Sequence, residues 1–198
     1  KYLNAHPDIA IPKRKELRFF VKEKILQTSW MDPIKKTLIN SSILNEKKYF
    51  EMMNANNLKL VGDASIHYFN HPEISIPLIQ KYVGDIPIII ILRNPVDRLI
   101  SNWRYILHDI YDLKQSLKLE DKRKKYCYNS FWFYKEQSIY CDKVEKFINN
   151  FSRVKVILFE DFFNDVKENM NDCFEFLGLN EFKEIDYFNI DKQDKGTN

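Results

Sequence analysis

The segment Ile86–Leu92 constrains the fold of this chain more than any other stretch of its sequence. It reads Ile-Pro-Ile-Ile-Ile-Ile-Leu, an almost continuous run of β-branched and aliphatic residues. Such a run is typical of a strand that is buried on both faces, as the strands of parallel sheets are. Pro87 stands near its start, where a missing backbone N–H is tolerated. The segment therefore predicts a strand of a parallel sheet.

Two further segments have the composition of strands, Val154–Phe159 and Leu58–Val61. Apolar residues recur elsewhere at three- to four-residue spacing, which is the pattern of amphipathic helices. These helical patterns cover residues 96–110, 134–151 and 166–177. Strands that alternate with long helices predict right-handed crossovers and an α/β fold of three layers, α/β/α, with a central parallel sheet.

The boundaries of the elements are marked unevenly. Gly178 directly follows the last helical pattern and suits the C′ position of a helix. Residues 113–128 are highly charged and show little periodicity, so we expect an exposed insertion there. No repeat, low-complexity tract or linker divides the chain, and we expect residues 1–198 to form a single domain.

The bulk composition argues against several classes of protein. With 198 residues, 44% of them hydrophobic, the chain can bury a real core. A net charge of +3, from 31 Lys and Arg against 28 Asp and Glu, does not indicate a nucleic-acid partner. No apolar run approaches the ~20 residues of a membrane span. The three Cys lack CxxC spacing and the four His are scattered, so we expect neither a disulfide framework nor a metal site.

Arg93 lies between the buried strand and the next helical pattern. Asn94 is a natural N-cap and Pro95 fits the first helical position. A helix start at the carboxyl end of a parallel strand offers free N–H groups to an anion, and Arg93 adds a fork of donors that suits phosphate. Ser101 falls off the apolar stripe and can donate its hydroxyl to the same anion. The residues alone leave open the alternative that Arg93 pairs with a carboxylate such as Asp97 and that Ser101 is plain helix surface.

Leu92–Trp103 resembles the segment that binds the 3′-phosphate in sulfotransferases that use 3′-phosphoadenylyl sulfate (PAPS). In that family an Arg at the strand end and a Ser eight positions later hold this phosphate, and Arg93 and Ser101 have that spacing. Other segments resemble family segments in the expected order, among them the Lys-Glu-x-x-Phe-Phe and Gly-Glu-x-Ser-Pro-x-Tyr segments of the heparan-sulfate-type branch. They are residues 2–9, 12–20, 61–69, 138–144, 159–162 and 176–179.

The resemblance implies a P-loop nucleotide-hydrolase-like fold and a reaction. The reaction would move a sulfuryl group from PAPS to a hydroxyl or amine acceptor and release adenosine 3′,5′-bisphosphate, without a metal. The heparan-type segment suggests a carbohydrate acceptor, while relatives also sulfate small alcohols, amines and lipids. Two alternatives stay open. One is a non-catalytic nucleotide-binding remnant, and the other is a related α/β phosphotransferase, which would need a phosphate loop with a Mg²⁺-binding Ser or Thr.

The resemblance also assigns roles to residues outside the 3′-phosphate segment. Glu16 would be the general base that takes the acceptor's proton, with a solvated surface charge as the alternative. Lys15 and Arg18 would guide an anionic acceptor or steady the sulfuryl oxygens, or else form an exposed basic loop. Ser65 would lie near the sulfuryl site or cap a turn after its strand. Tyr140 would stack on or hydrogen-bond the adenine, with core packing as the alternative.

Several family features are absent from the sequence. The Gly-rich, Lys-containing loop for the 5′-phosphosulfate has no counterpart among the four Gly of the chain. Ala64 stands where heparan-type members often have Lys, and Ile66 replaces the usual Pro. The C-terminal cofactor loop is suggested only by Lys195-Gly196. Because the chain also begins at Lys1 without a Met, we expect a fragment truncated at both ends.

Some features predict little. We take His67 and His71 as ordinary turn or core histidines, and the oligomeric state is not predicted. Usage rich in Lys, Asn and Ile, with no visible targeting signal, favours a microbial cytoplasmic enzyme. The Golgi lumen is the alternative compartment.

Overall fold

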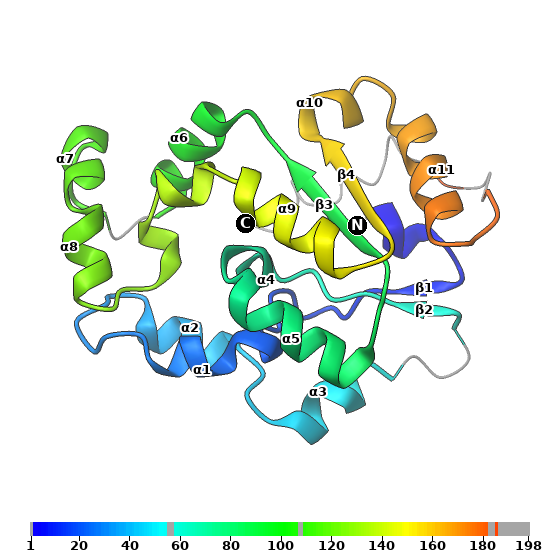
Figure 1. The fold of residues 1–198 in the computed structure, drawn as a ribbon, viewed down its shortest axis with the longest axis horizontal. Coiled ribbons are helices and arrows are strands. Elements are labelled where there is room, and N and C mark those ends of the chain that lie inside the picture. Colours follow the sequence, from blue (N-terminus) through cyan, green and yellow to red (C-terminus); the bar gives the residue numbers. More distant parts are fainter. Residues whose placement is uncertain (1, 55–57, 107–108, 182–184, 186–198) are drawn as a thin grey trace.

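The central strands are β3 (Ile88–Leu92) and β4 (Val154–Leu158). They pair in parallel, with Ile88 opposite Val154 and Leu92 opposite Leu158. Figure 1 shows them in the middle of a computed structural model, which describes residues 2–54, 58–106, 109–181 and 185. The two clearest predicted strands are thus confirmed.

A second parallel pair is formed by β1 (Ile9–Ala10) and β2 (Leu60–Val61). β2 confirms the weakest predicted strand over two of its residues. β1 is too short to leave a pattern in the sequence, which predicts only a helix end and a turn at this place. In the described part of the chain the strands therefore form two parallel ladders, β1–β2 and β3–β4, where one central sheet is expected.

Helices surround these strands. In chain order the α-helices are α1 (Lys22–Leu26), α2 (Lys35–Ser41), α3 (Glu46–Met52), α4 (Ile66–Asn70), α5 (Pro72–Val83), α6 (Pro95–Tyr105), α7 (Leu113–Lys118), α8 (Glu120–Lys125), α9 (Cys141–Asn150), α10 (Phe159–Phe162) and α11 (Val166–Phe176). Short 3-10 helices are η1 (Tyr2–Ala5), η2 (Phe19–Val21), η3 (Ser130–Trp132) and η4 (Glu136–Ser138).

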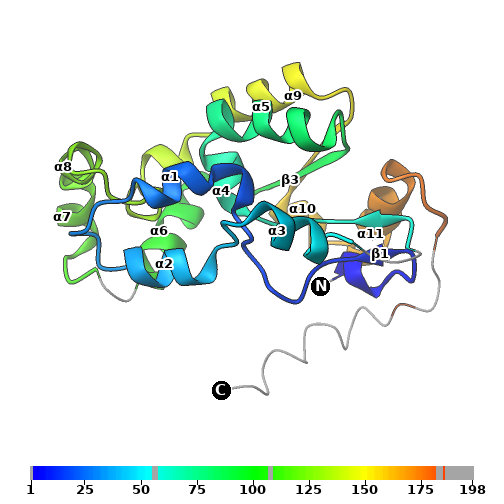
Figure 2. The same ribbon diagram turned by 90° about the horizontal axis from the view of Figure 1, so that it is seen from below.

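Side chains of β3 alternate between two hydrophobic cores, as the period of two in a strand requires. Ile88, Ile90 and Leu92 pack in one core with residues of α5 and α9. Ile89 packs in the other with Ile157 of β4 and the buried face of α11. Figure 2 shows α5 and α9 side by side over the strands, with β1 on the opposite side. Helices therefore lie on both sides of the central strands, which confirms the predicted α/β arrangement. The expected full burial of the first strand is wrong at one position, because Ile91 is 58% exposed.

The helix ends follow local signals. α6 begins at Pro95 and α11 ends just before Gly178, which has a φ of 75°. The Gly178 N–H donates to the Glu175 carbonyl at 2.9 Å, which closes the helix in the left-handed conformation that glycine favours. The pattern predicted over residues 134–151 becomes a shorter helix, α9, because its first part forms η4 and a loop. Residues 107 and 108, at the end of the first helical pattern, lie outside the described residues.

The expected exposed insertion at residues 113–128 is wrong. This segment forms α7 and α8 and buries polar side chains against the rest of the protein. The Glu120 carboxylate accepts the backbone N–H groups of Lys135 and Glu136 at 2.9 and 3.0 Å. The Arg123 guanidinium lies 4.8 Å from the centre of the Trp132 ring. The buried face is polar, and for this reason it leaves no hydrophobic periodicity in the sequence.

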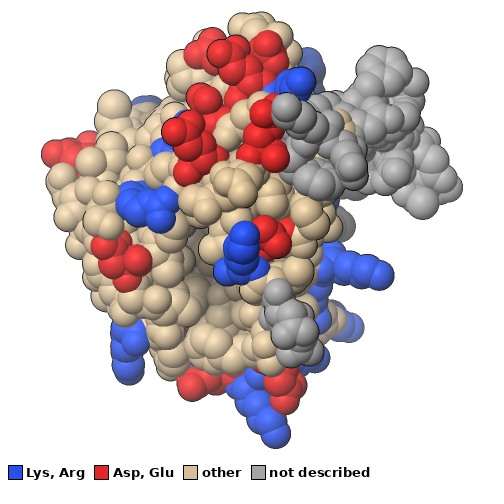
Figure 3. Space-filling view, turned by 90° about the vertical axis from the view of Figure 1, so that its right-hand side faces the viewer, with Lys and Arg blue, Asp and Glu red and all other residues tan. Residues whose placement is uncertain are grey.

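The charged side chains are unevenly distributed over the surface. On the face shown in Figure 3, acidic side chains gather at the top, where α10 and the start of α11 lie, and basic side chains are scattered. Lys195-Gly196, the suggested trace of a C-terminal cofactor loop, lies outside the described residues.

Candidate functional site

The junction between β3 and α6 is built by its local sequence. The Asn94 side-chain oxygen accepts the backbone N–H groups of Val96 and Asp97 at 3.0 and 3.4 Å, and Pro95 follows as the first helical residue. The backbone N–H of Asn94 itself donates to Glu160 at 2.8 Å. The predicted cap is confirmed, but the expectation of free N–H groups at this helix start is wrong. Any anion at the junction must be held by side chains.

Arg93 is placed to hold such an anion. Its guanidinium lies 5.1 Å from the centre of the Phe159 ring, and the side chain is half-buried. Among the described residues it forms no ion pair, so the alternative pairing with Asp97 is not observed. Its charge and, more strongly, the hydrogen bond from the Asn94 N–H lower the pKa of Glu160. A guanidinium that is immobilised on a ring and has no carboxylate partner fits an external phosphate.

Ser101 and Tyr140 lie on neighbouring elements. Ser101 is exposed on α6, and in the described structure its hydroxyl makes no hydrogen bond. Tyr140 precedes α9, and its hydroxyl donates to the backbone carbonyl of Arg93. Burial raises the pKa of the Tyr140 phenol. The structure therefore brings Tyr140 to the strand end that carries Arg93, as the resemblance implies.

Arg98 is a member of this cluster that the sequence reasoning missed. It lies on α6, one turn before Ser101, so the two side chains are neighbours on the helix surface. Its guanidinium donates to the Ser138 hydroxyl at 3.2 Å, and burial lowers its pKa. The signal that could have found it is the three-residue spacing to Ser101.

A second cluster forms around Glu16. One carboxylate oxygen, Oε1, accepts the backbone N–H of Ile66 at 3.3 Å, at the start of α4. The other, Oε2, lies 3.4 Å from Nδ1 of His67 and 3.6 Å from Nε of Arg18. The side chain is 28% exposed, so solvent or an acceptor can reach it. The backbone of Glu16 has a φ of 60°, a left-handed conformation that costs a non-glycine residue about 1–2 kcal/mol.

Arg18 is an internal cation. Only 6% of the residue is exposed, which contradicts the expected exposed basic loop. Its guanidinium donates to the Glu16 carbonyl at 3.0 Å, the Ser41 hydroxyl at 3.0 Å and Nδ1 of His67 at 3.1 Å. Its pKa is lowered by burial, against the opposing charge of Glu16. Lys15, by contrast, is exposed.

Ser65 and Asp63 connect this cluster to the core. The Ser65 hydroxyl accepts the backbone N–H of Arg18 at 3.1 Å and donates to Asp63 at 2.7 Å. Asp63 also accepts the hydroxyls of Tyr68 at 2.6 Å and Tyr49 at 3.2 Å. Burial raises the pKa of the Asp63 carboxyl, although these hydrogen bonds oppose the shift. Ser65 occupies the N-cap position of α4 without a side-chain capping bond, so it does not act as the expected turn cap.

Helix α4 joins the two clusters. Its first residues, Ile66 and His67, contact Glu16, and Phe69 near its end packs 6.4 Å from the Tyr140 ring. β2 leads through residues 62–65 into α4, and β3 ends just before Arg93, so the contact of Phe69 with Tyr140 links the carboxyl ends of these two strands. Ligands of α/β sheets collect at the carboxyl ends of strands. Glu16 and Arg93 thus belong to one region of the surface.

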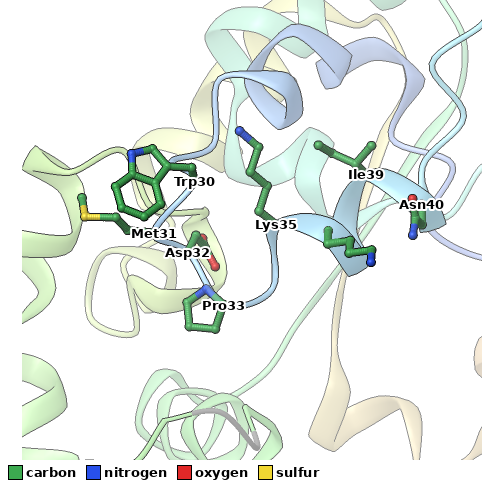
Figure 4. A pocket seen from close by; sticks show the side chains of 8 residues that line it. Trp30, Met31, Asp32, Pro33, Lys35, Ile39 and Asn40 are labelled. Carbon is green, nitrogen blue, oxygen red and sulfur yellow. The ribbon is translucent and has the colours of Figure 1, made fainter.

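An open cavity of about 490 Å³ is lined by residues 30–40, from Trp30 to Asn40 near the end of α2. Figure 4 shows Trp30, Met31 and Lys35 around it. Trp30 is 84% exposed, which is unusual for so large an apolar side chain. The far wall is α2, whose end is tied to the Glu16 segment by hydrogen bonds of Arg14 to the Asn40 carbonyl and of Arg18 to Ser41.

Comparison with known proteins places this geometry in a family. A family model described as sulfotransferase domain matches residues 32–194. The chain belongs to the sulfotransferase family. No protein in a search of curated proteins matches it. Among solved structures it is similar to a sulfotransferase from Alicyclobacillus acidocaldarius, with a TM-score of 0.81 and 30% identity over 97% of this chain and 82% of that one.

The sulfotransferase fold and family are therefore confirmed, and the geometry limits what its residues can do. The structure brings Arg93 and Tyr140 together and Glu16, Arg18 and Ser65 together. None of the described helices has the length and hydrophobicity to cross a membrane. The described residues also contain no group of three or more His, Cys, Asp and Glu side chains that could hold a metal ion.

Proposed function

We propose that this sulfotransferase moves a sulfuryl group from PAPS to a hydroxyl or amine of a carbohydrate acceptor. The observation that carries the proposal is the placement of two complementary clusters on either end of α4. One presents the guanidinium of Arg93, which pairs with no carboxylate of the described residues, and the other the partly exposed carboxylate of Glu16. A cation for a phosphate and a base for an acceptor are the two groups that transfer of an anionic group between oxygens requires.

Arg93 and Ser101 would hold the 3′-phosphate of the donor. Arg93 offers a fork of N–H donors and Ser101 a free hydroxyl, while Asn94 already satisfies the helix start. Tyr140 orients Arg93 through the Arg93 backbone carbonyl, and its half-buried ring would stack on the adenine of the donor. When bound, PAPS supplies the electrophilic sulfur and a phosphate leaving group.

Glu16 would take the proton of the acceptor. Ile66 and Arg18 fix the carboxylate in place, and its exposed edge remains open to an acceptor. Ser65 acts through Arg18 rather than on substrate, since both of its hydrogen bonds lie inside the protein. Lys15, one residue before Glu16 and exposed, would attract acidic groups of the acceptor.

The cavity at Trp30 would hold the body of the acceptor. The indole of Trp30 and the side chains of Lys35 and Lys36 line the same cavity, a combination that suits a sugar ring with acidic substituents. Hydrogen bonds of Arg14 to Asn40 and of Arg18 to Ser41 connect the α2 wall of this cavity to the Glu16 segment, so a sugar longer than the cavity would have a path toward the proposed base.

Replacement of the base tests the proposal. In a radiolabel transfer assay, Glu16→Gln should lower kcat at least 100-fold, since a positioned general base contributes about 10²–10⁴-fold. Affinity for adenosine 3′,5′-bisphosphate should stay unchanged. Glu168→Gln, the same change on the exposed surface of α11, is the control. Retained transfer in the Glu16 variant would remove this residue from the base role.

A further inference from the structure

Within the part of the chain that the structure describes, His67 contacts both Glu16 and Arg18 and has no role in the proposed reaction. It lies on α4 and is 0% exposed. The ring packs edge-on against Phe131, with 4.5 Å between the ring centres. A fully buried imidazole needs partners for both nitrogens, and these partners decide which nitrogen carries the hydrogen.

The neighbours of His67 assign its hydrogen to Nε2. The Asn129 side-chain oxygen accepts the backbone N–H of Phe131 at 3.0 Å, so it is an acceptor also for Nε2 of His67, at 3.4 Å. Arg18 can only donate, and its Nε–H points at Nδ1 of His67 at 3.1 Å. Nδ1 therefore carries a lone pair, and the ring is neutral.

This assignment places two acceptors face to face. Oε2 of Glu16 lies 3.4 Å from the same Nδ1, and the Arg18 N–H is the one donor between them. Two acceptors at this separation repel, and one added proton would turn the contact into a hydrogen bond that shares the Nδ1 lone pair with the Arg18 N–H. One proton between Oε2 of Glu16 and Nδ1 of His67 would satisfy both atoms, and this is the position where the proposed base would acquire a proton.

Burial and the surrounding charges keep the His67 ring neutral at rest. Burial lowers the pKa of His67 most strongly, Arg18 and His71 add to the shift, and Glu16 opposes it. Asp63 is the other carboxylate that faces Glu16, and its own hydrogen bonds to Ser65 and Tyr68 leave it outside the pair. From the segment of residues 129–131, only the neutral Asn129 and Phe131 contact the ring.

We propose that Glu16 and His67 work as one proton-accepting pair, in which Nδ1 of His67 shares the proton that Glu16 takes from the acceptor. This proposal rests on the assignment of Glu16 as the base. The electron pair of the acceptor X–H bond forms the bond to sulfur, and the bond from sulfur to the leaving phosphate breaks with its electrons. The proton binds to Oε2 of Glu16, and the O–H group that forms donates a hydrogen bond to Nδ1 of His67. His67 is therefore a positioning residue that stabilises protonated Glu16.

A pH profile separates this role from a structural one. His67→Asn keeps a polar group near Nδ1 but cannot accept a proton. It should lower kcat/KM about 10- to 100-fold and move the acid limb of the profile about one pH unit lower, because an amide oxygen is a far weaker base than Nδ1 and stabilises protonated Glu16 less. His71→Asn is the matched control, since His71 is buried at the C-cap of α4 but bonds Ser130. It should leave the acid limb in place. A lower rate with an unmoved acid limb in the His67 variant would overturn the proposal.

Nitrogen NMR of the histidine side chains gives a second readout that needs no activity. In the wild type, His67 should be neutral with its hydrogen on Nε2. Glu16→Gln should shift its titration to lower pH, because the carboxylate favours protonation of the ring. If the His67 titration is the same in Glu16→Gln as in the wild type, the proposed pair is refuted, and this result does not depend on whether His67→Asn folds. If the His67 titration shifts in Glu16→Gln but this variant keeps full activity, the two side chains are coupled and Glu16 is not the base.

Discussion

Replacement of Arg18 by Met removes a buried charge. The sequence suggests an exposed position for Arg18, but only 6% of the residue is exposed. Met has a similar length and no donors, so three hydrogen bonds are lost, to Glu16, Ser41 and His67. Each hydrogen bond to a charged group is worth about 1.5–3 kcal/mol, and these bonds share one guanidinium, so their losses do not add. Breaking a buried ion pair typically destabilises by about 3–5 kcal/mol, and we expect Arg18→Met to fall in that range.

Urea and thermal denaturation measure this loss. For a chain of this size, the expected change lowers the midpoint by roughly 6–20 °C. Lys15→Met is the matched control, since Lys15 is exposed three residues away and its replacement should change stability by less than about 0.5 kcal/mol. If Arg18→Met were as stable as the wild type and raised only the acceptor KM, Arg18 would be a substrate cation and its internal placement would be refuted.

Three further predictions concern the surroundings of the site. Asp109→Asn should lower stability at pH 7. Although burial opposes ionisation, hydrogen bonds from Arg123 and Tyr134 lower the pKa of Asp109. The carboxylate therefore stabilises the fold above its unfolded pKa of ~3.9, and denaturation curves of the two proteins should converge as the pH falls through the depressed folded pKa. Gly178→Ala should lower the free energy of unfolding by roughly 1–2 kcal/mol through backbone strain alone, because φ is 75° there and the added Cβ meets no atom. Asn tolerates this conformation better, so an equal loss in Gly178→Asn would argue against backbone strain. Trp30→Ala should raise the acceptor KM and leave stability and nucleotide affinity unchanged, and an unchanged KM would exclude this cavity as the acceptor site.

Local signals in the sequence predict the junction of β3 and α6 well. A run of β-branched residues, a capping Asn and a Pro at the first helical position act within a few residues of one another, and each appears in the structure as expected. The same holds for Gly178 at the end of α11. Only the free N–H groups were wrongly expected, because the Asn94 side chain that starts the helix also occupies its first donors.

Long-range polar contacts explain what local patterns could not predict. Arg18 stands among Lys and Arg residues and looks exposed, but its partners Ser65 and His67 lie 47 and 49 residues away in the sequence. The same separation conceals the role of His67. In α8, Glu120 and Arg123 look like solvated charges until Lys135 and Trp132 are folded against them. Hydrophobic periodicity does not reveal such polar pairs. The family resemblance suggests what a residue does, but it does not show whether that residue is buried.

Isothermal calorimetry with adenosine 3′,5′-bisphosphate and adenosine 5′-monophosphate tests the central claim most directly. The wild type should bind the bisphosphate more tightly. Arg93→Ala should remove roughly 10- to 100-fold of that affinity, the equivalent of about 1.5–3 kcal/mol for a charge-assisted contact, and leave the monophosphate unaffected. Arg153→Ala is the control, because Arg153 also stacks on a ring, that of Phe176, but lies at the opposite end of the central strands. Equal affinity for the two nucleotides, or no effect of Arg93→Ala, would contradict the assignment of this junction to the 3′-phosphate.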